Sequence, residues 1–169
     1  ESERSYLETM VRVGRVACQV ARIAHDNLLD VQNFIERYRI RIMEMEWIDG
    51  YDLARLLTQS MLDRVEKKVS KKRWMEINDV IVTKGPVRPR LKPGIAVAII
   101  RECLGGLAAL HREEIVHGDV KPSNIMIKRT GNAKIIDIGS AIELNNRPKR
   151  LTCTPAYAAP ETIDRDELT

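Results

Sequence analysis

Apolar residues follow a helical period in two long stretches of this chain. In residues 4–24 they recur three or four positions apart, which is typical of a helix with one buried side. In residues 94–111 they cover nearly every face, which is typical of a helix in the middle of a domain. Gly105 and Gly106 weaken this second helix by about 1 kcal/mol each. We expect close packing against a neighbouring element to offset that cost.

Shorter stretches between these helices have the composition and period of β-strands. Val31 to Phe34 predicts a short strand, and Arg39 to Trp47 alternates strongly enough for a second one. Asp52 can cap a helix that reaches about Met61, and the chain through Trp74 could continue as helix. Val80 to Thr83 is typical of a further short strand.

A turn signal, Thr130-Gly131-Asn132, separates two more strand-like stretches. Residues 124–128 and 133–136 flank this turn and predict a hairpin. The hairpin would have Asn124 at one end and Asp137 at the other, so both side chains would emerge at the same edge. Because helices and short strands are mixed along the chain, the predicted fold class is α+β.

The densest group of candidate catalytic residues precedes this hairpin, in the run His117-Gly118-Asp119-Val120-Lys121-Pro122-Ser123-Asn124. Thirteen residues beyond Asn124 (137 − 124 = 13) comes Asp137-Ile138-Gly139. A further 24 residues on (161 − 137 = 24) comes Glu161, which closes Ala159-Pro160-Glu161. Phosphoryl transfer from ATP needs a carboxylate that receives the hydroxyl proton, a cation for the γ-phosphate, and oxygen ligands for Mg²⁺. These residues supply such groups in order.

In order and spacing these residues resemble the eukaryotic-type protein kinase family, whose catalytic loop, D-F-G triplet and A-P-E triplet follow one another in this way. Lys121-Pro122 and the segment Thr154-Pro155-Ala156-Tyr157 resemble its serine/threonine branch. The resemblance extends from about His25 to Glu161.

The resemblance implies a protein-kinase-like α+β fold of two parts. Residues 1–48 would be a remnant of the small lobe, with its regulatory helix and its last two strands. Residues 49–169 would be the first part of the helical large lobe. The basic stretch at about 62–93 stands where the family usually has a short linker, and we interpret it as an insertion. A complete kinase of this family is longer than 169 residues, so we expect the chain to be a fragment.

The resemblance also implies a role for each polar residue of the motifs. Asp119 is the expected catalytic base for a serine or threonine hydroxyl of a protein substrate. Lys121 is expected to neutralise charge on the γ-phosphoryl group, and Thr154 to join the activation segment to Asp119 and Lys121. Asn124 and Asp137 are the expected Mg²⁺ ligands, so ATP and Mg²⁺ are the implied cofactors.

A hinge between the two lobes is implied near Ile48. Met45 would be the gatekeeper, the backbones of Glu46 and Ile48 would meet the adenine edge, and Asp52 would lie near the ribose hydroxyls. The residues expected to contact the nucleotide are Met45, Glu46, Ile48, Asp52, Lys121, Asn124, Met126 and Asp137.

Three departures from the family pattern change the expectations. Gly118 replaces the arginine through which a phosphate on the activation segment organises the site, so Thr152 is a weak candidate switch. Ile138 replaces a phenylalanine, and Val16 stands where the family usually has a glutamate. These 169 residues also contain no glycine-rich phosphate loop. We therefore expect the chain alone to bind Mg-ATP weakly and to phosphorylate poorly.

Composition adds limits on partners and compartment. Residues 62–93 hold ten Lys or Arg and four Asp or Glu, a local balance of +6 (10 − 4), within a chain of net charge +4. With little aromatic interleaving there, we expect a solvated basic surface rather than a nucleic acid-binding one. Three unpatterned cysteines suggest reduced thiols and a cytoplasmic location. The sequence contains no run of about 18 apolar residues, so we expect no membrane-spanning segment in it.

Two other functions stay open at this point. A small-molecule phosphotransferase of the aminoglycoside or choline kinase type shares the H-G-D-x-x-x-x-N loop, but it usually has histidine where Lys121 stands. A pseudokinase scaffold would use the fold for binding, with the basic insertion as its contact surface. Apolar surface left uncovered in a partial kinase domain would favour self-association.

Overall fold

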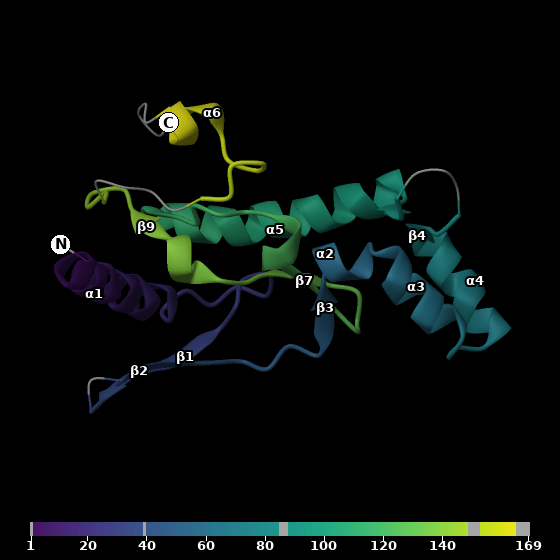
Figure 1. Cartoon of the computed structure of the whole chain (residues 1–169), viewed down its shortest axis with the longest axis horizontal. Coiled ribbons are helices and arrows are strands. Elements are labelled where there is room, and N and C mark those ends of the chain that lie inside the picture. Colours follow the sequence, from purple (N-terminus) through teal and green to yellow (C-terminus); the bar gives the residue numbers. More distant parts are fainter. Residues whose placement is uncertain (1, 39, 85–87, 149–152, 165–169) are drawn as a thin grey trace.

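The computed structural model describes residues 2–38, 40–84, 88–148 and 153–164. Helices and short antiparallel strands are mixed along the chain, which confirms the predicted α+β class (Figure 1). The elements in chain order are α1 (Ser2–Val20), β1 (Val31–Arg37), β2 (Ile40–Met45), β3 (Gly50–Asp52), α2 (Leu53–Leu56), α3 (Gln59–Glu66), α4 (Lys71–Val80), β4 (Ile81–Val82), β5 (Arg90–Leu91), α5 (Pro93–Arg112), β6 (Ile115–Val116), the 3-10 turn η1 (Pro122–Asn124), β7 (Ile125–Lys128), β8 (Ala133–Ile135), the 3-10 turn η2 (Ile138–Ser140), β9 (Ile142–Glu143) and α6 (Pro160–Asp164).

Helix α1 packs on the antiparallel β1–β2 hairpin at one end of the molecule (Figure 1). Val16, Ala17 and Val20 on its inner side are at most 1% exposed, as the apolar period of this helix predicts. The first predicted strand is β1, and it continues beyond Phe34 to Arg37 because its pairing with β2 continues to that residue. The second ends at Met45 rather than at Trp47.

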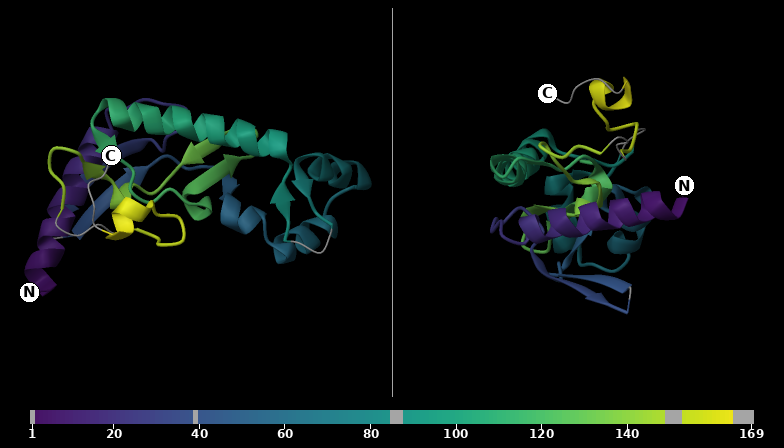
Figure 2. Two further views of the ribbon diagram at one scale, coloured as in Figure 1. Left: turned by 90° about the horizontal axis from the view of Figure 1, so that it is seen from above. Right: turned by 90° about the vertical axis from the view of Figure 1, so that its left-hand side faces the viewer.

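Helix α5 runs across the molecule and packs along β8 of the three-stranded sheet β3–β7–β8 (Figure 2). The central helix and the hairpin predicted from the sequence are therefore confirmed as α5 and β7–β8. Leu28, Leu110 and Ile135 are at most 1% exposed and belong to the core beneath the helix. A Cβ on Gly106 would lie 2.8 Å from the carbonyl oxygen of Asn27, so close packing accounts for this glycine.

The basic stretch forms α3, α4 and the β4–β5 hairpin, which lie at the end of α5 far from α1 (Figure 1). The helix predicted from Asp52 to about Met61 is wrong as one element, because α2 ends and the Thr58 side chain caps a new helix, α3. Continuous helix through Trp74 is also wrong, because the Ser70 side chain caps α4. A hydroxyl that accepts a backbone N–H of the next turn starts a helix at both places.

By length and apolar composition, α5 is the one helix among the described residues that could cross a membrane. Its contacts are those of a core helix, because it packs on β8 and β6 and buries Ile99, Cys103 and Leu110. The opposite side exposes more than half of Val97, Ile100 and Leu104. Uncovered apolar surface was expected for a partial kinase domain, and self-association stays a prediction.

Candidate active site

His117 is the first residue of the predicted catalytic loop and is 1% exposed. Its Nδ1 accepts the backbone N–H of Asp119 at 3.3 Å, so the ring proton is on Nε2, which donates to the carbonyl of Ile136 at 3.0 Å. Burial lowers the pKa of His117 and keeps the ring neutral. The imidazole therefore fixes the loop that carries Asp119 to the segment that leads into Asp137.

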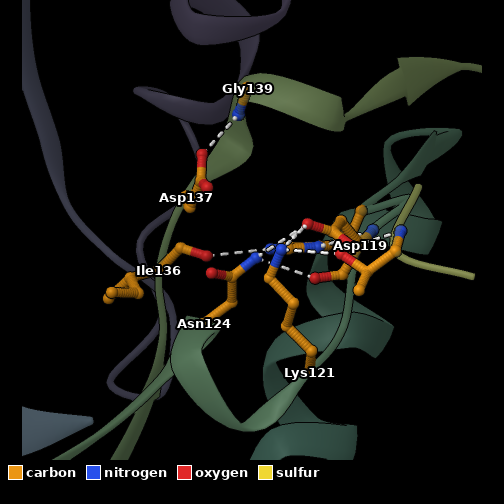
Figure 3. A network of polar contacts seen from close by, with 8 residues as sticks. Asp119, Lys121, Asn124, Ile136, Asp137 and Gly139 are labelled. Atoms are coloured by element: carbon orange, nitrogen blue, oxygen red, sulfur yellow. Dashed lines mark hydrogen bonds and ion pairs between the residues drawn. The ribbon is translucent and has the colours of Figure 1, made fainter. Parts of the chain in front are cut away.

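The carboxylate of Asp119 is the acceptor at the centre of the polar network (Figure 3). Its Oδ2 accepts Lys121 Nζ at 2.5 Å and Asn124 Nδ2 at 3.3 Å, and its Oδ1 accepts the backbone N–H of Thr154 at 3.0 Å. Burial by itself would raise the pKa of Asp119, but the hydrogen bonds from Lys121 and Thr154 outweigh it and lower the pKa. Asp119 is therefore ionised at neutral pH.

Lys121 joins two segments that are 33 residues apart in the sequence. Besides its ion pair with Asp119, its ammonium donates to Thr154 Oγ1 at 2.7 Å. The structure thus brings together the three residues that the sequence proposed for catalysis. Thr152, the weak candidate switch, lies outside the described residues.

Asn124 directly precedes β7, and Asp137 comes shortly after β8, so both lie at the same end of this hairpin. The backbone N–H of Ile136 donates to the carbonyl of Asn124 at 2.9 Å, and the Asn124 amide nitrogen donates to the Asp119 carbonyl at 2.9 Å. Asp137 has a left-handed backbone (φ 65°), and its carboxylate turns toward Gly139, whose N–H it accepts at 3.1 Å (Figure 3). A non-glycine residue in this conformation is strained, which is a feature of functional sites.

The donor chemistry of this pair fits Mg²⁺. The amide nitrogen of Asn124 is committed to Asp119, so its amide oxygen and the Asp137 carboxylate are the two hard oxygen donors of the site. Within the described ranges there is no group of three or more His, Cys, Asp or Glu that could hold a metal ion. Mg²⁺ commonly binds through one or two protein ligands together with substrate phosphates, so two donors suffice.

The residues predicted to contact the adenine and the ribose come from β2, β3, β7 and the segment between β2 and β3. Asp52 on β3 and Met126 on β7 are directly paired. The Asp52 carboxylate caps α2 by accepting the N–H of Arg55 at 2.8 Å. A contact with the ribose would therefore use a carboxylate that also caps this helix. The backbone N–H of Glu46 donates to the carbonyl of Asp30 at 3.0 Å, and a contact of the Glu46 carbonyl with an adenine stays a prediction. Ile48 is buried, whereas Met45 is 43% exposed.

Comparison with known proteins agrees with this geometry. The family model described as "Protein kinase domain" matches residues 17–169, which is most of the chain. The chain belongs to the protein kinase family. It is 30% identical to the serine/threonine-protein kinase STE20 of Debaryomyces hansenii over 149 residues, which are 85% of this chain. It is 37% identical over 92 residues, 52% of this chain, to the serine/threonine-protein kinase PknL of Mycobacterium tuberculosis. The chain spans 11% of the length of the first relative and 22% of the second.

One departure from the kinase pattern has a clear steric reason. Gly118 has φ +80°, and a Cβ there would lie 2.5 Å from the carbonyl oxygen of Ser140. The segment after Asp137 therefore packs directly on the catalytic loop, where the family usually has an arginine. The usual arginine does not fit this packing.

Contacts between α1 and β9 were missed by sequence reasoning. Arg15 forms an ion pair with Glu143 at 2.6 Å, and Gln19 donates to the same carboxylate at 2.5 Å. Arg12 donates to the carbonyl of Ala141 at 2.8 Å. These three polar side chains recur at helical spacing on α1, but the sequence did not show which segment they would meet. They fix the first part of the kinase activation segment to the helix.

The buried His117 predicts a pH dependence of stability. Its folded pKa is lowered from an ordinary value of 6.5, so the unfolded chain binds this proton first as the pH falls. The free energy of unfolding should therefore decrease below about pH 6.5, by up to about 1.4 kcal/mol per pH unit. Urea unfolding at pH 7.5, 6.5 and 5.5 measures this slope.

In that experiment His117→Gln should reduce the slope, because the glutamine does not titrate. His111→Gln, the same change at the exposed end of α5, is the matched control and should keep the wild-type slope. Equal slopes for both variants would contradict the neutral, buried state of His117.

Proposed function

We propose that this chain is the catalytic region of a serine/threonine protein kinase that transfers the γ-phosphoryl group of ATP to a protein hydroxyl. The observation that carries the proposal is the Asp119 carboxylate, which Lys121 and Thr154 contact from two sides. The relatives named serine/threonine-protein kinases support the same substrate chemistry.

Asp119 would act as the base in this reaction. Its lowered pKa keeps it ionised, so it can orient a serine or threonine hydroxyl and accept its proton as the bond to phosphorus forms. A strongly stabilised carboxylate is a weak base for a free alcohol. Acceptance of the proton late in the transfer, when the hydroxyl has become acidic, fits such a group.

Lys121 and Thr154 would prepare the same site for negative charge. The Lys121 ammonium lies between Asp119 and the Thr154 hydroxyl, so it can turn from this pair to the transferred phosphoryl group. Thr154 fixes the activation segment against the loop while this happens. Asn124 and Asp137 would hold Mg²⁺, which offsets the charge of the ATP phosphates when bound.

The chain of 169 residues by itself is expected to bind Mg-ATP weakly and to transfer slowly, because its own sequence supplies no glycine-rich loop over the phosphates. The test therefore uses the intact protein with labelled ATP, Mg²⁺ and a mixture of protein substrates. The wild-type protein should label serine and threonine. Asp137→Asn should lower incorporation by at least about tenfold, because it replaces a metal-binding carboxylate.

Asp79→Asn is the matched control for this experiment, because Asp79 is an exposed residue of α4. It should leave incorporation unchanged. Equal labelling by the wild type and Asp137→Asn would refute the proposed function.

A binding module without phosphoryl transfer is the second candidate, and one observation favours it. Val16, at the place of the usual kinase glutamate, is fully buried, so α1 presents no carboxylate there. Mg²⁺-dependent binding of a nucleotide by the intact protein, measured by calorimetry, separates the two candidates. Absence of Mg²⁺-dependent nucleotide binding would favour the scaffold.

A further inference from the structure

We propose that Lys134 is a positioning residue for the adenine ring, because its buried side chain fixes the hinge residue Glu46. This inference rests on the proposed function and names a residue that the family motifs do not include. The sequence suggested a backbone contact for Glu46 and no role for Lys134.

Lys134 belongs to a row of residues that crosses the three-stranded sheet. Asp52 on β3 is paired with Met126 on β7, and Met126 is paired with Lys134 on β8. Residues directly opposite one another in antiparallel strands point to the same face. Lys134 thus shares a sheet face with two residues predicted to contact the nucleotide.

The ammonium of Lys134 reaches from this face to the hinge. The residue is 5% exposed, and its Nζ donates to the carbonyl of Leu28 at 3.0 Å and forms an ion pair with Glu46. Glu46 Oε1 also accepts the backbone N–H of Asp30 at 2.8 Å. The backbone N–H of Glu46 also donates to the carbonyl of Asp30. This hinge residue is therefore fixed through both its main chain and its side chain.

The electrostatics of the pair agree with this role. Burial by itself would raise the pKa of Glu46, but the hydrogen bond from Lys134 and the N–H of Asp30 outweigh it and lower the pKa. The Glu46 carboxylate is therefore ionised, and a buried lysine needs such a partner. Loss of either charge would leave the other side chain without its ion-pair partner, so the hinge backbone could shift.

The expected consequence is specific to the base of the nucleotide. The hinge would contact adenine, whereas Lys121, Asn124 and Asp137 lie on the phosphate side of the site. Lys134→Met in the intact protein should weaken Mg-ATP binding by about tenfold, the equivalent of one lost hydrogen bond. It should change the affinity for Mg-tripolyphosphate, which has no base, by less than about twofold. Calorimetry with these two probes measures both affinities.

Matched variants keep the test decisive. Lys72→Met removes a cation from the exposed surface of α4 and should leave both affinities unchanged. Glu46→Gln keeps the size of the side chain and the Leu28 contact of Lys134, and it should reproduce the selective loss even if Lys134→Met is poorly folded. Lys134→Arg, which retains the charge, should partly restore Mg-ATP binding.

Three outcomes would overturn the inference. Unchanged Mg-ATP affinity in both Lys134→Met and Glu46→Gln would remove the positioning role. Equal weakening of both probes would indicate a general effect on the fold or on the phosphates. Absence of Mg-ATP binding by the wild-type protein would refute the proposed function itself, and the inference with it.

Discussion

Asp119→Asn should lower the rate of phosphoryl transfer by about 10²- to 10⁴-fold, the usual contribution of a general base. Asparagine keeps the size of the side chain and can still accept the N–H of Thr154. It loses the charge that pairs with Lys121, and an amide cannot take the proton of a substrate hydroxyl. Initial rates of incorporation into a serine or threonine substrate by the intact protein measure the loss.

The affinity for Mg-ATP separates a catalytic effect from a structural one. Asp119 is not among the residues expected to bind the nucleotide, so calorimetry with Asp119→Asn should give an affinity close to the wild-type value. Asp79→Asn again provides the control for a neutralised aspartate. A rate within about twofold of the wild type would exclude Asp119 as the base.

Gly118→Ala should destabilise the chain by about 2–4 kcal/mol and disrupt the catalytic loop. The left-handed backbone costs an alanine about 1–2 kcal/mol. The new Cβ would in addition lie 2.5 Å from the backbone oxygen of Ser140, a contact that requires the two segments to separate. Urea unfolding measures the change in the free energy of unfolding.

Gly131→Ala is the matched control, because Gly131 also has a positive φ, +100°, but a Cβ added there would meet no atom within 4 Å. Gly131→Ala should lower the free energy of unfolding only by the cost of the left-handed backbone. The additional loss in Gly118→Ala then measures the packing of Ser140 on the catalytic loop. Equal destabilisation would contradict that packing. Gly118→Arg should likewise impair activity rather than introduce phosphate control.

The sequence predicted the parts of the fold that have local causes. The β7–β8 hairpin follows from the turn at Thr130-Gly131-Asn132, and α5 follows from its apolar period. The two wrong helix boundaries also have local causes, because the Thr58 and Ser70 side chains are N-caps that each start a new helix. Their signal was present in the sequence.

The sequence by itself determined the chemistry of the site: which carboxylates, amide and ammonium are present, and their order along the chain. Only the tertiary structure decided which of them meet, because Thr154 joins Lys121 across 33 residues and Lys134 joins Glu46 across 88. Partners so distant are selected by the packing of whole elements, and no local period records them. Lys134 illustrates this, since a lysine in an apolar strand suggests an exposed edge until its distant partner is known.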